Sequence, residues 1–214
     1  MYPDAGGARP ALREMAARLA SLGYAVLLPD VYYRNGQWAP FDMKAVFADK
    51  AERNRIFAMM NAITPEMTTC DAGAFFDYLQ TRPETAGERF GITGYCMGGR
   101  MSLVVAGRVP DRVGAAMSFH GGGLATDDPD SPHLLADRMR AAVYVGAAEN
   151  DPSYTDEQSA TLESALGGAG VRYAIEWYAA AHGFAVPDNA TYDRSAAERH
   201  WRAMERFFGE HSDS

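Results

Sequence analysis

The 214-residue sequence contains few cysteines, no long apolar run and no cluster of basic residues. No window of eighteen residues is wholly apolar, so the sequence has no candidate for a membrane-spanning helix. The first twenty residues also lack the apolar core of a secretory signal peptide, because they include the charged residues Asp4, Arg9, Arg13 and Glu14. We therefore expect a soluble, cytoplasmic protein.

Charge and cysteine content exclude several other classes of protein. The chain has 20 Lys and Arg against 28 Asp and Glu, a formal net charge of −8 without any basic stripe, which argues against nucleic acid or anionic membranes as partners. Its two cysteines, Cys70 and Cys96, cannot build a disulfide framework, and no Cys-x-x-Cys or His-x-x-x-His pair suggests a metal. We expect neither a metal nor a cofactor, and the two thiols are either catalytic or buried.

The pattern of apolar segments predicts an α/β fold. A hydrophobic content of 47% over this length fits one domain spanning residues 1–214. Short apolar runs predict strands at 24–28, 90–93, 113–119, 141–145 and 173–178. Helical periodicity and capping residues predict helices that begin at Pro10, span 43–60, 64–80 and 156–166, and close the chain at 194–208. This alternation predicts a mostly parallel sheet with helices on both faces.

The segment Gly94-Tyr95-Cys96-Met97-Gly98 has the form Gly-x-nucleophile-x-Gly, with cysteine in the usual place of serine. This motif places its nucleophile on a strained turn between a strand and a helix, where a Cβ at either glycine would collide with the turn. A helix starting at Met97 would direct its N-terminal amides at the sulfur and stabilise negative charge there. The alternative is that Cys96 is a small core residue and the glycines only allow a tight turn.

Two further candidates follow the last predicted strands, where the loops beyond the carboxyl ends of parallel strands form functional sites. Asp151 follows the run at 141–145, with Glu149 as a less favoured substitute, and His182 follows the run at 173–178. The order nucleophile, acid, base along the chain is that of α/β-hydrolases. The alternatives are that Asp151 only forms a turn before Pro152 and that His182 is a surface residue.

The remaining histidines and the second cysteine are expected to have structural or surface positions. We expect His133, His200 and His211 at the surface. His120 follows a strand and is expected to line the pocket, although its place in the chain order is wrong for the base. Cys70 lies within a predicted helix and is expected in the core or half-buried.

Taken together, these motifs give a sequence that resembles the dienelactone hydrolase family, within the α/β-hydrolase fold. The resemblance rests on Gly-Tyr-Cys-Met-Gly-Gly at 94–99, Gly23-Tyr24, Leu28-Pro29-Asp30-Val31-Tyr32, Phe41-Asp42-Met43, Asp151 and His182-Gly183-Phe184. It implies hydrolysis of a small-molecule ester or lactone by a Cys96–His182–Asp151 triad through an acyl-thioester. It also implies an oxyanion hole formed by the amides of Ala5 and Met97, and an acidic residue, Asp4, that is linked to the state of the thiol.

Two departures from the family pattern leave the substrate open. The resemblance implies an arginine for a substrate carboxylate four residues after the catalytic histidine, but this position is Val186. Arg53 or Arg55 is a candidate replacement. The resemblance also implies two or three strands before Asp4, whereas three residues precede it. We therefore expect a fold without the usual first strands, in a chain truncated at its N-terminus relative to its relatives.

Hydrolysis has two alternatives. The alternative from another class is a non-catalytic α/β-hydrolase-fold protein that binds a small molecule. A redox-sensing thiol is disfavoured, because the sequence has no neighbouring resolving cysteine. We expect a monomer or a small homo-oligomer.

Overall fold

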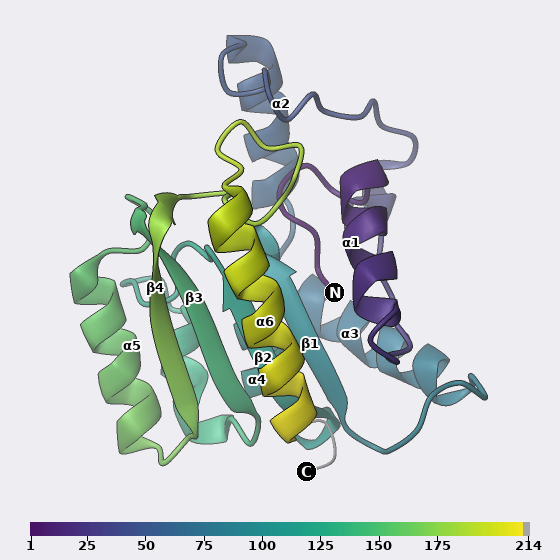
Figure 1. Cartoon of the computed structure of the whole chain (residues 1–214), viewed down its shortest axis with the longest axis vertical. Coiled ribbons are helices and arrows are strands. Elements are labelled where there is room, and N and C mark those ends of the chain that lie inside the picture. The colour runs from purple at the N-terminus through teal and green to yellow at the C-terminus, as the bar shows by residue number, and fades with distance from the viewer. Residues whose placement is uncertain (212–214) are drawn as a thin grey trace.

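A four-stranded parallel sheet forms the centre of the computed structural model, which describes residues 1–211 except for the side chain of Asn150 (Figure 1). The strands are β1 (Phe90–Tyr95), β2 (Val113–Phe119), β3 (Ala142–Asn150) and β4 (Tyr173–Ala181), and they pair in sequence order. All three pairs are parallel. The four strands predicted from residue 90 onward are confirmed, and three of them extend further toward their carboxyl ends than expected.

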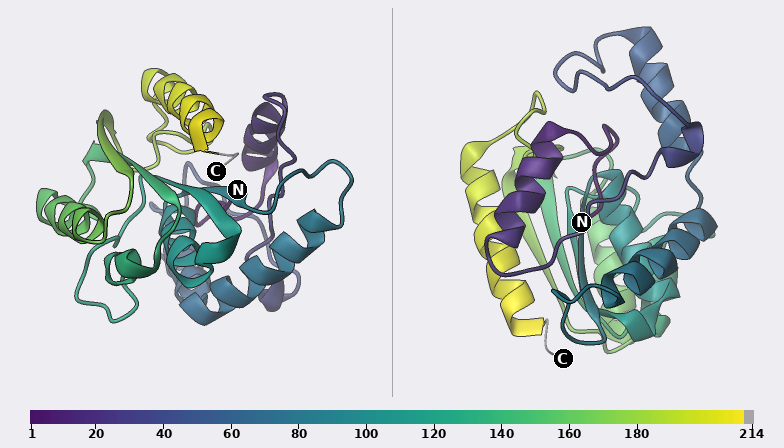
Figure 2. Two further views of the ribbon diagram at one scale, coloured as in Figure 1. Left: turned by 90° about the horizontal axis from the view of Figure 1, so that it is seen from below. Right: turned by 90° about the vertical axis from the view of Figure 1, so that its right-hand side faces the viewer.

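Helices cover both faces of the sheet, as predicted (Figure 2). On one face lie α3 (Pro65–Gln80), α4 (Met97–Arg108) and α5 (Asp156–Gly168), and on the other lie α1 (Pro10–Ala20) and α6 (Arg194–His211). The buried apolar side chains accordingly form two clusters, one on each side of the sheet. Among the described residues, no helix has both the length and the apolarity needed to cross a membrane.

Side-chain caps set where two of the helices begin. The Thr64 hydroxyl accepts a hydrogen bond from the Met67 amide, so α3 begins at Pro65 as predicted. The helix predicted from residue 43 begins later, as α2 (Lys50–Asn61). The Asp49 carboxylate accepts hydrogen bonds from the amides of Ala51 and Glu52, which fixes this start, and residues 43–47 form turns instead.

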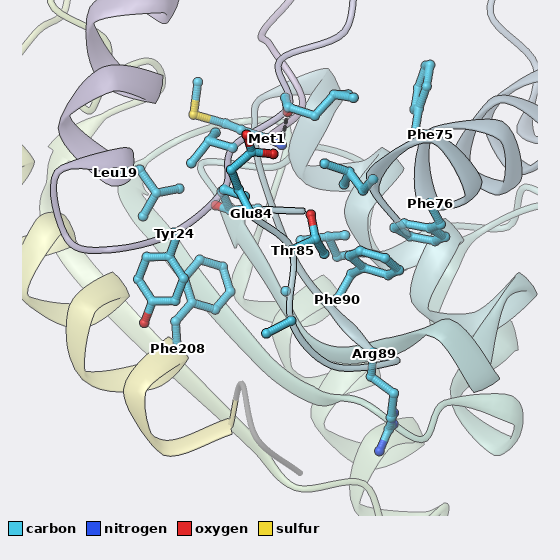
Figure 3. A pocket seen from close by; sticks show the side chains of 18 of the residues that line it. Met1, Leu19, Tyr24, Phe75, Phe76, Glu84, Thr85, Arg89, Phe90 and Phe208 are labelled. Carbon is cyan, nitrogen blue, oxygen red and sulfur yellow. Dashed lines mark hydrogen bonds between the residues drawn. The ribbon is translucent and has the colours of Figure 1, made fainter. Parts of the chain in front are cut away.

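The prediction of a strand at residues 24–28 is wrong. This segment has no strand partner, and a cavity of about 310 Å³ separates it from β1, with Tyr24, Phe76, Phe90 and Phe208 among the lining side chains (Figure 3). The edge of β1 instead forms a single parallel bridge between Gly94 and Tyr2. An apolar run shows that a segment can be buried in a sheet, but it does not specify a backbone partner.

Two predictions about burial are also wrong. Cys70, expected in the core, is exposed on α3. His200, expected at the surface, is fully buried beneath α6, where its Nε2 lies 3.2 Å from the Tyr95 hydroxyl and burial lowers its pKa to about 4. His200 belongs to the face of α6 that also buries Trp201, and the apolar neighbours on that face determine its burial.

The turn between β1 and α4 consists of one residue, Cys96, whose φ angle is +54°. A Cβ added at Gly94 would lie 2.0 Å from the Gly98 carbonyl oxygen, and one added at Gly98 would lie 2.4 Å from the Pro3 carbonyl oxygen. The steric reason for the two flanking glycines is therefore confirmed, since both contacts are with backbone atoms that have no freedom to rotate away.

Replacing Gly94 with alanine should destabilise the protein strongly, by at least about 2 kcal/mol in the free energy of unfolding, because its new methyl group would overlap backbone. The matched control is Gly73→Ala in α3, where no atom lies within 4 Å of the added Cβ. This variant should gain roughly 0.5–1 kcal/mol from helix propensity. Urea denaturation of both variants measures the difference, and a Gly94→Ala protein as stable as the parent would contradict the steric argument.

Candidate active site

Cys96 lies at the carboxyl end of β1 and directly before the first turn of α4. Its backbone N–H donates to the Phe119 carbonyl 3.0 Å away, and its own carbonyl accepts from the Gly99 amide at 2.9 Å. These bonds hold the strained residue between sheet and helix. The side chain is partly exposed, and Cys96 is among the residues that line a cavity. A nucleophile here is rigidly held and accessible.

His182 and Asp151 lie together beside Cys96. His182 follows β4 and Asp151 follows β3, so the parallel arrangement brings both side chains to the same end of the sheet. The His182 Nδ1 lies 2.7 Å from the Asp151 Oδ2, and Cys96 lies near enough to raise the pKa of His182. The structure therefore brings all three predicted residues together, whereas Glu149 is exposed to solvent.

The charges around His182 favour its protonated form. Burial lowers the pKa of His182, but the negative charge of Cys96 and hydrogen bonds to Asp151 and Cys96 outweigh this effect and raise it to about 10. Burial raises the pKa of Asp151, yet its hydrogen bonds with His182 and Ser153 lower the pKa overall. The surroundings of His182 therefore favour an imidazolium at this position.

Ser153, which sequence reasoning did not assign, and His120 both contact this pair. The Ser153 hydroxyl donates to the Asp151 Oδ1 at 2.5 Å, which leaves Oδ2 for His182. His120 packs its ring 5.1 Å from that of His182, and its φ angle is +38°. Burial and the neighbouring His182 hold the pKa of His120 well below its usual value, so it is neutral. His120 is 1% exposed and is not among the residues that line the cavity, so the prediction that it lines the pocket is wrong, and it packs against His182 instead.

Ala5 and Met97, the predicted oxyanion-hole residues, both line the same cavity as Cys96. Met97 is the first residue of α4, so its N–H has no acceptor within the helix. Tyr32 is fully buried, and its hydroxyl donates to the Ala5 carbonyl at 2.8 Å while lying 3.8 Å from the Met97 sulfur. Tyr32 therefore fixes the peptide of Ala5 relative to the start of α4.

Asp4 contacts an arginine that sequence reasoning did not single out. Its carboxylate accepts hydrogen bonds from Arg9 at 2.5 and 3.0 Å, and Arg9 also makes two bonds of 2.7 Å to Asp188. Arg9 is 5% exposed and Asp4 is 2% exposed. The cluster joins the loop that carries Ala5 to the loop that follows His182. No sequence spacing signals it, because 179 positions separate Arg9 from Asp188.

The cavity beside Cys96 has a volume of about 790 Å³. The cavity is lined by side chains that include Cys96, Asp151 and His182, others from α4, and others from the segment around α2. The α2 segment lies beyond the carboxyl ends of the strands (Figure 1). Neither Arg53 nor Arg55 is part of its lining, and Val186 is fully buried elsewhere. Among residues 1–211, no group of three His, Cys, Asp or Glu side chains is arranged to hold a metal ion.

A family model, curated relatives and solved structures match this chain. Residues 1–212 match the model of the dienelactone hydrolase family. The carboxymethylenebutenolidase of Pseudomonas putida is 27% identical over 192 residues, which cover 89% of this chain and 76% of that protein. A dienelactone hydrolase-like promiscuous phosphotriesterase from metagenomic libraries has a TM-score of 0.72 at 27% identity, over 98% of this chain and 84% of that one. A crystal structure from Klebsiella pneumoniae subsp. pneumoniae shares the fold, with a TM-score of 0.83 at 23% identity, over 97% of this chain and 84% of that one.

Removing the Cys96 sulfur should lower the pKa of His182. In the parent protein, His182 should stay protonated until the pH approaches about 10. Because this pKa is raised above 6.5, the stability it contributes is full below pH 6.5 and is lost as the pH rises through about 10. Cys96→Ala removes one negative charge and one hydrogen bond, so the imidazole should titrate at a lower pH.

An NMR titration of the histidine ring nitrogens measures this pKa directly. The matched control is Cys70→Ala, which removes an exposed thiol on α3 and should leave the titration unchanged. An unchanged pKa in Cys96→Ala would show that the sulfur carries no charge beside His182.

Replacing Arg9 with methionine should cost about 3–5 kcal/mol in the free energy of unfolding, because the buried carboxylate of Asp4 would lose its partner. The matched control is Arg18→Met, which removes another two-bonded arginine–carboxylate pair, with Glu198, that is exposed. That loss should stay within about 1 kcal/mol. Urea denaturation compares the two, and equal losses would contradict the role assigned to burial.

Proposed function

Because the chain belongs to the dienelactone hydrolase family, we propose that it hydrolyses a carboxylic ester or lactone of a small molecule through Cys96. The observation that carries this proposal is the contact between three side chains. The His182 Nδ1 lies 2.7 Å from the Asp151 Oδ2, and Cys96, which lines the same cavity, is near enough to raise the pKa of His182. A thiol, an imidazole and a carboxylate in this order provide a nucleophile, a proton carrier and a group that orients the imidazole.

In the first half of the proposed reaction, the Cys96 thiolate attacks the carbonyl carbon and forms a carbon–sulfur bond. The carbonyl electron pair moves to oxygen, and the amides of Ala5 and Met97 donate hydrogen bonds to the resulting oxyanion. When the tetrahedral intermediate collapses, the bond to the alcohol oxygen breaks. The departing alkoxide takes a proton from the His182 imidazolium, which leaves a thioester on Cys96 and a neutral histidine.

In the second half, neutral His182 takes a proton from a water molecule as that water attacks the thioester carbon. The carbon–sulfur bond then breaks, which releases the carboxylic acid and restores the thiolate and the imidazolium. Asp151 keeps its hydrogen bond to His182 Nδ1 throughout, so the other ring nitrogen remains directed at Cys96. His182 therefore gives one proton to the alcohol in the first half and regains one from water in the second, so the enzyme returns to its starting state.

For Asp4 we propose an indirect influence on the thiol. Its carboxylate accepts bonds from Arg9, from the Gly6 amide at 3.0 Å and from the Asn189 side chain at 3.3 Å. Direct contact with Cys96 would require Asp4 to leave these donors. Through them, Asp4 holds the loop of Ala5, whose amide is one of the two proposed oxyanion donors.

Cys96→Ala should lower kcat for a short-chain aryl ester at least about a thousandfold, since it removes the nucleophile. Cys70→Ala, the control, should retain full activity. An acylating probe should label one thiol in the parent protein, and this labelling should require an intact His182. Hydrolysis assays and mass spectrometry of the labelled chain provide the two measurements.

The same experiment tests the alternative, a non-catalytic binding protein. If the folded parent protein hydrolyses neither an aryl ester nor a butenolide lactone, and Cys96 is not acylated, the hydrolase proposal is wrong. Activity retained in Cys96→Ala would instead assign the reaction to another residue.

A further inference from the structure

Much of the lining of the cavity beside Cys96 is apolar. These side chains come from the segment before α3, from the first residue of α3 and from α4. The residues are Phe47, Phe57, Met60, Ile63, Pro65, Met97, Met101 and Val104. At about 790 Å³ the cavity has room for a group considerably larger than the reacting carbonyl. Most of the space is therefore available for the rest of the substrate.

Two of these side chains are aromatic and exposed. Phe47 is 50% exposed and Phe57 is 42% exposed, and their ring centroids lie 6.2 Å apart. Phe47 precedes α2 and Phe57 lies within it, so the pair faces the cavity from beyond the ends of the strands. Covering such rings with an apolar group removes hydrocarbon surface from water, which is favourable by an amount proportional to the area covered.

The charged groups in the cavity lining are mainly acidic. Glu66, Asp128 and Asp130 belong to this lining, in addition to the Asp151 that pairs with His182. The lining has one arginine, Arg100. Its guanidinium donates to the Asp128 carboxylate at 3.0 Å and to the carbonyls of Gly123 and Asp130. The guanidinium of Arg100 is therefore already engaged in hydrogen bonds within the protein.

Two arginines outside the lining, Arg108 and Arg55, are likewise engaged elsewhere. Arg108 pairs with Glu66 at 2.8 Å and with Asp130 at 2.6 Å. Arg55 pairs with Glu52 and donates to the Ala39 carbonyl, with its guanidinium over the ring of Phe41. Within the part of the chain that the structure describes, no arginine of the cavity lining remains for a carboxylate of the substrate.

We propose that the substrate is a neutral ester with an extended apolar group, and that this group lies against Phe47 and Phe57. This inference rests on the proposed function, because it names the substrate class of the same site. An anionic substrate would meet the carboxylates of Glu66, Asp128 and Asp130 in the cavity lining, where the arginine, Arg100, is already paired with Asp128. A neutral apolar group would instead cover the aromatic pair and reach the carbonyl position at Cys96.

Hydrolysis of two matched series of esters tests this substrate class. The first series lengthens the acyl chain of a para-nitrophenyl ester from acetate to hexanoate, and the second lengthens the alcohol of a neutral acetate ester. In at least one series, kcat/KM should rise roughly fourfold per methylene until the cavity is filled. A para-nitrophenyl ester with a terminal carboxylate should react at least about tenfold more slowly than its neutral analogue of equal length.

Variants of Phe47 and Phe57 test whether these two rings cause the preference for a long ester. The Phe47→Ala, Phe57→Ala double variant should lose at least about tenfold of the preference for the long ester over acetate. Tyr78→Ala is the matched control, because Tyr78 is an aromatic residue 54% exposed on α3 and outside the cavity lining. It should keep the parent preference. Phe57→Arg should shift the preference toward the carboxylate ester, since it adds the missing cation.

Three results would overturn the inference: equal rates across both series, an unchanged preference in the double variant, or faster hydrolysis of the carboxylate ester. Circular dichroism and thermal melting establish that each variant is folded. If the folded parent hydrolyses no ester, the proposed function fails. The binding of neutral and anionic ligands to the Cys96→Ala variant then tests separately whether the cavity prefers a neutral apolar group. In ligand-observed NMR, a neutral alkyl ketone should bind better than the oxo acid of equal length, and the reverse order would overturn it.

Discussion

The positive φ angle of Cys96 is the constraint on which the rest of the site depends. It allows β1 to end and α4 to begin with one residue between them, so the side chain lies at the end of the sheet. This geometry requires two glycines, since a Cβ at Gly94 or Gly98 would overlap backbone oxygens. It also makes Met97 the first residue of α4, with an N–H that no helical carbonyl can accept. One strained residue thus determines both the thiol position and a free amide beside it.

The position of His182 and Asp151 follows from the parallel sheet. Carboxyl ends of parallel strands meet at one edge, so residues directly after β1, β3 and β4 converge although 86 positions separate Cys96 from His182. This is why apolar runs, turn residues and chain order were sufficient to predict the four paired strands, the pairing of His182 with Asp151 and the position of Cys96 between a strand and a helix. Each of these three features depends on local sequence and on topology. None of them requires knowledge of a particular long-range contact.

What the sequence could not predict depends on such contacts. The segment at 24–28 has the composition of a strand, but strand formation requires a backbone partner, and the edge of β1 bridges to Tyr2. His200 is polar and yet buried, because it shares a face of α6 with Trp201. Arg9 meets Asp4 and Asp188 only in the folded chain, and through this cluster the Ala5 loop is tied to the loop after His182. Long-range charge pairs of this kind leave no local pattern.

The site also separates the chemistry from substrate selection. Cys96, Asp151 and His182 follow strands and are held by the sheet, whereas Phe47 and Phe57 belong to turns and a helix beyond it. A change in this second segment leaves the hydrogen bonds of His182 intact, because they are made with Asp151, Ser153 and Thr191. The hydrogen bonds of the proposed triad are therefore independent of the apolar area that we propose for the substrate. A chain built in this way can change which ester it accepts while the proposed triad stays constant.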